Sequence, residues 1–152
     1  MSKTVFVTGG AGYVGSHSAK AFARAGWEVV TYDNLSRGWR DLVKWGPLIE
    51  GDILDTDALT TALKDVRPDA VAHFAAFAYV DESMKQPEMY YRNNVSGTLS
   101  LLEAMRAAEV KRMVFSSSCA TYGVHSDLIT EATVHSPITP YGASKLICER
   151  MI

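Results

Sequence analysis

The stretch TVFVTGGAGYVGSH, residues 4–17, places glycine at positions 9, 10, 12 and 15, between an apolar run and a segment with helical spacing. Glycine loses more backbone entropy on folding than any other residue, so four glycines in seven positions need a reason. The stretch satisfies G-x-G-x-x-G from Gly10 and G-x-x-G-x-x-G from Gly9. A glycine turn between a strand and a helix is typical of a loop that holds a dinucleotide pyrophosphate. An ordinary glycine-rich turn is the alternative.

Each glycine in this motif has a separate expected task. One makes the turn from strand to helix, another lets the pyrophosphate approach the backbone, and Gly15 lets the helix pack closely on the strand. The helix N-terminus adds free N–H groups and the positive end of the helix dipole. We therefore expect Gly9, Gly12 and Gly15 to form a cofactor-binding turn.

The composition is that of an ordinary globular protein and excludes several classes of function. The 152 residues predict one domain, with 47% hydrophobic and 21% charged residues. A net charge of −2 argues against nucleic acid as a partner. The longest apolar stretch, Ala70–Val80, is too short to span a membrane, and no signal peptide pattern precedes it. Two cysteines and four scattered histidines have no metal-ligand spacing, so we expect two free thiols and no metal site. Free thiols, together with the lack of a signal peptide pattern and of a membrane span, predict a soluble cytoplasmic protein.

Apolar runs alternate with amphipathic segments along the whole chain, which predicts an α/β fold with a parallel sheet covered by helices on both faces. The expected strands are residues 4–8, 28–32, a short strand within 47–53, 70–74 and 112–116. The expected helices are one that stops at Gly26, one capped by Asp55, a long one with Val95, Leu99, Leu102 and Met105 in one stripe, and one capped by Thr139 that begins at Pro140. Residues 123–137 are expected to form a long loop.

An acidic residue follows the second expected strand at the spacing that a dinucleotide site requires. Asp33 lies 18 residues after Gly15, close to the ~20 at which a carboxylate bonds the adenosine ribose. Such a carboxylate repels a 2′-phosphate and favours NAD over NADP, although Arg37 nearby weakens that preference. A cap at the strand end is the alternative. Asp52 ends the third strand at the same edge of the sheet.

Tyr141 and Lys145 are four residues apart, which places them on one face of a helix. An ordinary tyrosine has a pKa of about 10, too high for a base at neutral pH. A lysine ammonium one turn away, together with a nicotinium ring, would favour the phenolate. A surface pair on a helix is the alternative. Ser118 follows the fifth strand and could hydrogen-bond the substrate oxygen that Tyr141 deprotonates.

Two further segments lie where a cofactor is expected. The small residues of HFAAFAYV, which begins at His73, would let a cofactor lie against the backbone. Asn93 and Asn94 lie at the start of the long helix, where asparagine has poor propensity. A buried amide there could fix the neighbouring backbone or a loop, and a solvated side chain is an equal alternative for Asn93.

The motifs TGGAGYVGSH, YDN, GDI, HFAA, YYRNNVSGT, FSSSCATYG and PYGASK occur in this order along the whole chain. In this the sequence resembles the extended short-chain dehydrogenase/reductases, in particular UDP-glucose 4-epimerase and its relatives. The resemblance implies a Rossmann-type doubly wound parallel sheet, tightly held NAD, a UDP-sugar substrate and a homodimer in the full-length family. It implies Ser118, Tyr141 and Lys145 as the catalytic set. The implied cofactor contacts are Tyr13, Val14, Asp33, Asn34, Asp52, Ile53, Phe74, Ala75, Ala76, the following residues to Ala78, Asn94, Tyr141 and Lys145.

The reaction implied by the resemblance starts when Tyr141 takes the proton of the sugar C4 hydroxyl. NAD takes the C4 hydride, the 4-keto sugar turns over, and the hydride returns to the other face. The position of Ala78 often holds lysine in UDP-glucose epimerases, and AYVDES and SSSCATYG are more similar to the UDP-arabinose/UDP-xylose 4-epimerase branch. Nucleotide-sugar dehydratases carry an acidic pair where Cys119 and Ala120 follow Ser118, which argues against them. An NAD-binding module without catalysis is the other alternative.

Length is the largest departure from the family, whose members run to about twice this chain. Residues 1–152 are expected to be an NAD-binding Rossmann domain that is incomplete at its C-terminus, with about five strands and without the substrate domain. For this chain alone we expect weak or heterogeneous dimers, poor NAD binding and no epimerisation.

Overall fold

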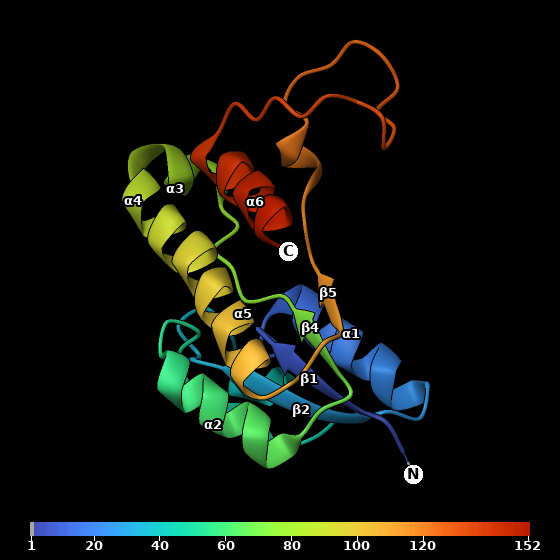
Figure 1. The fold of residues 1–152 in the computed structure, drawn as a ribbon. Coiled ribbons are helices and arrows are strands. Elements are labelled where there is room, and N and C mark those ends of the chain that lie inside the picture. The colour runs from blue at the N-terminus through green and yellow to red at the C-terminus, as the bar shows by residue number, and fades with distance from the viewer. Residues whose placement is uncertain (1) are drawn as a thin grey trace. The chain divides into compact units, whose positions relative to one another are not determined.

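A computed structural model describes residues 2–152, which form two compact units (Figure 1). The first unit contains the described residues up to Ala75 together with Ser100–Ser116. The second contains Ala76–Leu99 and Ser117–Ile152. The two units are described separately.

The first unit is built on a five-stranded parallel sheet with the strand order β3-β2-β1-β4-β5. Val5 in the middle strand lies opposite Val29 on one side and Ala70 on the other. The sheet confirms the α/β class and the five expected strands. Their bounds are β1 (Thr4–Thr8), β2 (Glu28–Asp33), β3 (Leu48–Glu50), β4 (Ala70–His73) and β5 (Met113–Phe115).

Helices cover both faces of this sheet. Alternate residues of a strand point to opposite faces, so one strand contributes to two separate clusters. On one face Phe6 joins a buried cluster with residues of α2 (Thr56–Val66) and α5 (Gly97–Ala107). On the other face Val5 and Val7 pack with Ala19 of α1 (Tyr13–Arg24). The short 3₁₀ helix η1 (Arg40–Leu42) lies between β2 and β3 in the chain.

The expected helix ends in this unit are confirmed by their hydrogen bonds and backbone angles. The Ala58 N–H donates to Asp55 Oδ1 at 3.0 Å, which satisfies one of the free N–H groups at the start of α2. Gly26 follows α1 with φ of +84°, the left-handed conformation that commonly ends a helix.

The second unit is helical. It contains α3 (Val80–Lys85), α4 (Pro87–Tyr90), the π-helical segment η2 (Tyr91–Ser96), the start of α5, the 3₁₀ helix η3 (Cys119–Thr121) and α6 (Pro140–Met151). Thr139 caps α6 as expected, with Gly142 N–H donating to Thr139 Oγ1 at 3.1 Å. Residues 123–137 form the expected long loop between η3 and α6.

The expected apolar stripe of the long helix is wrong in part. Leu99 is 48% exposed, whereas Leu101 and Ala104 are fully buried. Within α5 the buried side includes the polar residues Thr98 and Ser100. The buried side of η2 is also polar, which a count of apolar residues cannot detect. Among the described residues, no helix has the length and apolar character needed to cross a membrane.

Candidate functional site

The glycine turn closes tightly on itself and on the end of β4. Gly9 has φ of +71°, and a Cβ there would lie 2.4 Å from the backbone nitrogen of Ala75. A Cβ on Gly15 would lie 2.1 Å from the carbonyl oxygen of Gly9. These separations are shorter than atoms tolerate, so both positions require glycine for the fold alone. The close packing expected at Gly15 is confirmed.

Gly12 differs from these two glycines. Its backbone is extended, with φ of −81° and ψ of 172°, and the nearest atom to a Cβ there would be the Gly9 carbonyl oxygen at 3.3 Å. Packing within the protein therefore gives only a weak reason for glycine. Gly12 is the N-cap of α1, no acidic residue follows in the first turn, and the side chains of Tyr13 and Val14 are exposed. This helix start can hold an anionic group close to its backbone.

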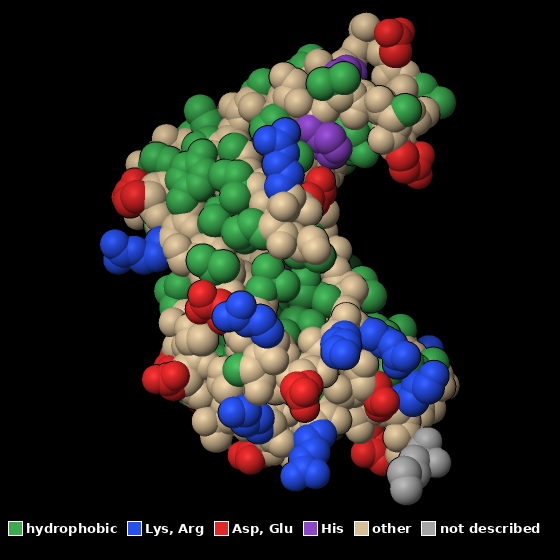
Figure 2. All heavy atoms as spheres, viewed as in Figure 1, with side chains coloured by type: hydrophobic (Ala, Val, Ile, Leu, Met, Phe, Trp, Pro, Cys, Tyr) green, Lys and Arg blue, Asp and Glu red, His purple; other side chains and the backbone are tan. Residues whose placement is uncertain are grey.

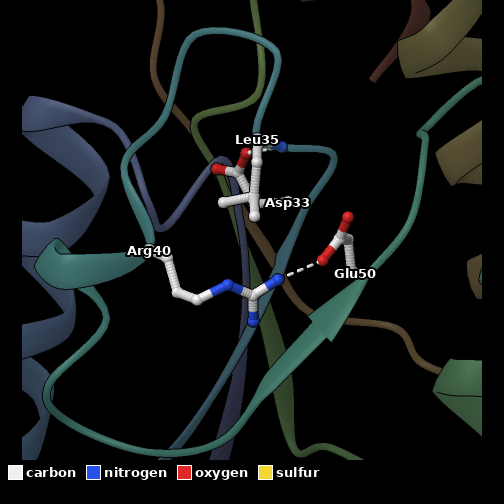
Figure 3. Close-up of polar contacts among 4 residues, drawn as sticks. All are labelled: Asp33, Leu35, Arg40 and Glu50. Carbon is white, nitrogen blue, oxygen red and sulfur yellow. Dashed lines mark hydrogen bonds and ion pairs between the residues drawn. The ribbon is translucent and has the colours of Figure 1, made fainter.

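Asp33 joins the glycine turn to the loop after β2. Its side chain is buried, and Oδ2 accepts a hydrogen bond from Ala11 N–H at 2.9 Å. Oδ1 accepts from Leu35 N–H at 2.8 Å, the contact of a local cap (Figure 3). Trp39 N–H also donates to the Ala11 carbonyl at 2.9 Å. Asp33 thus makes the cap contact and also fixes the turn on which a phosphate would rest.

Polar groups at the ends of β2 and β3 form a second small network. Asn34 Nδ2 donates to Asp52 Oδ2 at 3.0 Å, and the Tyr32 hydroxyl donates to the Asp52 carbonyl at 3.1 Å. Burial, followed by the charges of Asp55 and Asp52, raises the pKa of Tyr32 to about 12, so this hydroxyl keeps its proton. The Ile53 side chain is buried in the core, so only its backbone is available to a cofactor.

An exposed ion pair lies beside this network. Arg40 of η1 pairs with Glu50, the last residue of β3, as Figure 3 shows. Both side chains are more than half exposed, so the pair contributes little to stability.

The segment after β4 is fixed by backbone contacts. Phe74 N–H donates to the Thr8 carbonyl at 2.9 Å, and Ala75 packs against both Gly9 and the core. The buried His73 side chain lies with Nδ1 2.6 Å from Thr8 Oγ1, which places this histidine in a core role. Ala76, the third small residue expected to line the cofactor, begins the second unit.

Asn94 ties two segments of the second unit together. Its Oδ1 accepts from Phe77 N–H at 2.8 Å, and its Nδ2 donates to the Phe77 carbonyl at 3.0 Å and to Ser144 Oγ at 3.1 Å. The side chain is 1% exposed. Of the two roles considered for it, fixing the neighbouring backbone is therefore the one that its contacts serve. The solvated alternative for Asn93 is wrong, because that residue is buried and donates to Asn94 Oδ1.

Tyr141 and Lys145 lie one turn apart on α6, but they are not a surface pair. Lys145 is 4% exposed, and burial lowers its pKa from 10.5 to about 8, with Cys148 and Glu149 opposing the shift. The half-buried Tyr141 ring packs edge-to-face on Tyr90, with centroids 6.4 Å apart and planes at 80°. Burial also raises the pKa of the Cys148 thiol.

The first turn of α6 packs directly on η3. A Cβ on Gly142 would lie 2.4 Å from the Ala120 carbonyl oxygen, so glycine is required for this approach. Ser118 is the N-cap of η3, and its Oγ accepts from Ala120 N–H at 3.1 Å. The three expected reacting residues therefore come from two elements of the second unit that pack together. Sequence reasoning gave no role to Tyr90 or Ser144, because no spacing rule marks them. It named Phe77 only among the cofactor contacts that the resemblance implies.

Comparison with known proteins gives the family and the closely similar structures. The NAD dependent epimerase/dehydratase family matches residues 5–152. The chain is 47% identical over 152 residues to the UDP-glucose 4-epimerase of Rhizobium meliloti, covering 99% of this chain and 46% of that protein. It is 46% identical over 159 residues to the putative UDP-arabinose 4-epimerase 4 of Arabidopsis thaliana, covering 97% of this chain and 36% of that protein.

Solved structures are also similar throughout the chain. Among them is the UDP-glucose 4-epimerase from Brucella ovis in complex with NAD, with a TM-score of 0.96 and 53% identity, covering 99% of this chain and 46% of that chain. The resemblance drawn from the motifs is thereby confirmed. This chain spans about half the length of the relatives that it matches.

Proposed function

This chain belongs to the NAD dependent epimerase/dehydratase family, and on that premise we propose that it carries the cofactor-binding and proton-transfer residues of a UDP-sugar 4-epimerase. The observation that carries this proposal is the start of α6. There Tyr141 lies one turn from a buried Lys145 and on a helix packed against the turn that Ser118 caps. The similarity to UDP-glucose 4-epimerases over the whole chain supports it.

NAD fits the residues present in the first unit. Gly9 and Gly15 need to be glycine for packing within the protein. Gly12 has an extended backbone and only one moderate contact, so close approach of a ligand is the better reason for glycine at this position. The uncapped start of α1 suits a pyrophosphate, and Asp33 suits the adenosine ribose. In the first unit, the residues proposed to hold NAD are Gly9, Gly12, Tyr13, Val14, Gly15, Asp33, Asn34, Asp52, Ile53, Phe74 and Ala75. The resemblance also implies Ala76, Asn94, Tyr141 and Lys145, which belong to the second unit, as cofactor contacts.

In the proposed reaction Tyr141 takes the proton of the sugar C4 hydroxyl and later returns it. Lys145, with a pKa of about 8, is still largely protonated at pH 7, so it brings an ammonium to the face of α6 that carries Tyr141 one turn away. Ser118 donates its hydroxyl proton to the same sugar oxygen, while its Oγ still accepts from Ala120 N–H. NAD supplies the hydride acceptor and donor at the sugar C4.

UDP-glucose and UDP-galactose are the proposed substrates, and UDP-arabinose and UDP-xylose are the second candidates. The identities to the named glucose and arabinose epimerases are nearly equal, at 47% and 46%. Ala78 favours the second pair on the resemblance described above, because lysine is frequent at that position in glucose epimerases. An NAD-binding chain without turnover is the alternative from another class.

We also propose that the second unit associates with a second copy of the chain. Large hydrophobic side chains between residues 79 and 99 are exposed, namely Tyr79, Val80, Met84, Tyr91 and Leu99. Figure 2 shows hydrophobic side chains gathered at the upper left, where Figure 1 draws α3 and α4. Sedimentation at micromolar concentration tests this, and a strictly monomeric chain would contradict it.

The activity is tested by adding NAD and each UDP-sugar to two polypeptides and following the C4 epimers by NMR. One is the 152-residue chain, and the other continues it with the remaining part of the Rhizobium meliloti relative. We expect turnover of at least one sugar pair by the second polypeptide and its loss in Tyr141→Phe. NAD binding without turnover in both polypeptides would favour the module without catalysis.

A further inference from the structure

We propose that Tyr90 is a positioning residue for Tyr141, holding the reacting phenol ring in one orientation through an edge-to-face contact. The proposal rests on the proposed role of Tyr141 in proton transfer. The ring centroids are 6.4 Å apart and the planes are at 80°, within the range of favourable aromatic pairs. Both residues belong to the second unit.

Tyr90 can hold another ring because it is itself immobilised. Its side chain is 0% exposed, and its ring packs edge-to-face on Phe77 with centroids 5.9 Å apart. The hydroxyl accepts from Tyr79 N–H at 3.0 Å. Its single proton is donated either to the Tyr79 carbonyl at 2.7 Å or to Glu82 Oε2 at 2.6 Å. A buried ring that is fixed at its hydroxyl and packed on a second ring is a rigid partner for a third ring.

Tyr141 is held a second time, at its backbone. Ser144 Oγ donates to the Tyr141 carbonyl at 2.7 Å and accepts from Asn94 Nδ2 at 3.1 Å. Asn94 in turn bonds both backbone groups of Phe77, whose ring packs on Tyr90. The contacts therefore form one closed network, which links Tyr90, Phe77, Asn94, Ser144 and Tyr141 in that order, and Tyr141 contacts Tyr90 again. One contact fixes the backbone of Tyr141 and the other fixes its ring.

This arrangement matters for the proposed chemistry because a proton acceptor must lie within hydrogen-bond reach of the sugar hydroxyl. A misplacement of about 1 Å can cost roughly 10²-fold in rate. Ser144 and Asn94 act on the backbone of Tyr141 and not on rotation about its side-chain bonds. The packed ring of Tyr90 restricts that rotation.

NMR of the chain with isotope-labelled tyrosine tests the proposal without any need for activity. Tyr141→Phe assigns the Tyr141 ring signals. In the parent we expect a single χ1 rotamer from scalar couplings and a slow ring flip. Tyr90→Leu should give averaged couplings and a flip at least tenfold faster, whereas Tyr90→Phe, which keeps the ring edge, should retain the parent values. Phe22→Leu removes a partly buried ring in the first unit, where it packs on Trp27, and should change neither.

Turnover gives the second measurement, in whichever polypeptide epimerises a UDP-sugar. Tyr90→Leu should lower kcat about tenfold with KM within twofold, and Tyr90→Phe should restore kcat to within threefold of the parent. If Tyr90→Leu does not fold, Tyr90→Met replaces it, because methionine fills the space without a ring edge. Unchanged couplings and flip rate in the Leu or Met variant would overturn the proposal. Full turnover by Tyr141→Phe would instead overturn the proposed function, and the NMR result for Tyr90 would stand independently.

Discussion

The glycine turn of the first unit and the Tyr141 region of the second unit are fixed in opposite ways. The turn is fixed by contacts between backbone atoms: for example, the Gly9 carbonyl occupies the space that a Gly15 side chain would need. The Tyr141 region is fixed by side-chain contacts, such as the hydrogen bond between Asn94 and Ser144, which lie 50 residues apart in the sequence. The glycine turn depends on the absence of side chains at its glycines. The Tyr141 region depends on side-chain partners that only folding brings together.

This difference teaches which substitutions affect stability and which affect chemistry. Backbone packing tolerates no added atoms, so changes at Gly9 or Gly15 act on the fold. The support of Tyr141 consists of single side-chain contacts, so changes there act first on orientation. Five predictions test this contrast.

The largest effect is expected for Tyr141→Phe, which keeps the ring and its contact with Tyr90 but removes the proton acceptor. Loss of a general base typically lowers the rate by ~10²–10⁴-fold. The measurement is kcat for a polypeptide that epimerises a UDP-sugar, with Tyr91→Phe as the matched control. A kcat within threefold of the parent would exclude Tyr141 as the base and leave the second unit with a structural role only.

The next effect concerns Lys145, whose pKa is lowered from 10.5 to about 8 by burial. Below pH 8 both the folded and the unfolded chain carry the proton, and the fold bears the cost of a buried ammonium. Between pH 8 and 10.5 the unfolded chain holds a proton that the folded chain has lost, so the free energy of unfolding rises with pH. At about 1.4 kcal/mol per pKa unit, the rise is roughly 3 kcal/mol.

Urea denaturation across this pH range measures that contribution. The unfolding free energy of the parent minus that of Lys145→Met should rise by that amount between pH 8 and 10.5, because methionine does not titrate. The exposed Lys111→Met variant should follow the parent. Parallel curves for the parent and Lys145→Met would mean that the Lys145 amine titrates alike in both states.

Asp33→Ala tests the connection between the glycine turn and the cofactor. Loss of the carboxylate should weaken NAD binding by roughly 1.5–3 kcal/mol, the range for hydrogen bonds to a charged group. Isothermal titration calorimetry compares the variant with the parent and with Asp41→Ala, an exposed carboxylate in η1. Equal affinities would remove Asp33 from the NAD site and leave it with its contacts to Ala11 and Leu35.

Gly15→Ala and Gly12→Ala separate packing from binding within the turn. A Cβ at position 15 would clash with the Gly9 carbonyl, and such overpacking costs about 1–3 kcal/mol of stability. Gly12→Ala should cost less, about 0.5–1 kcal/mol, because alanine is a poorer N-cap than glycine, and it should weaken NAD binding. Urea titration and calorimetry are run on both variants. An unstable Gly12→Ala with unchanged affinity would show that packing alone explains this glycine.

The smallest effect is expected at the exposed Arg40–Glu50 pair. Arg40→Ala should lower the free energy of unfolding by less than about 1 kcal/mol, because both side chains are more than half exposed. Urea denaturation at low and at 1 M salt gives the measurement, and the difference should shrink with salt. A larger effect that persists in salt would mean that the loop after β2 depends on this pair.

Much of the fold and part of the site could be predicted from the sequence. The positions of the five strands along the chain, the caps at Asp55 and Thr139 and the glycine turn all come from local rules with a period or a fixed offset. The stripe of the long helix was predicted wrongly in part, because polar residues such as Thr98 and Ser100 lie on its buried side, where a count of apolar residues does not detect them. The cofactor and catalytic residues other than those of the turn remain proposals, since their roles concern a bound ligand.

The sequence by itself determined where the backbone must turn and pack closely, because glycine acts through the absence of a side chain. It also determined that Tyr141 and Lys145 share one face of a helix, since four residues make about one turn. Only the tertiary structure decided that Lys145 is buried, that Asn94 bonds Phe77 and Ser144, and that the Tyr90 ring meets Tyr141. Burial and side-chain contacts depend on segments far apart in the chain, and no local spacing encodes which of them meet.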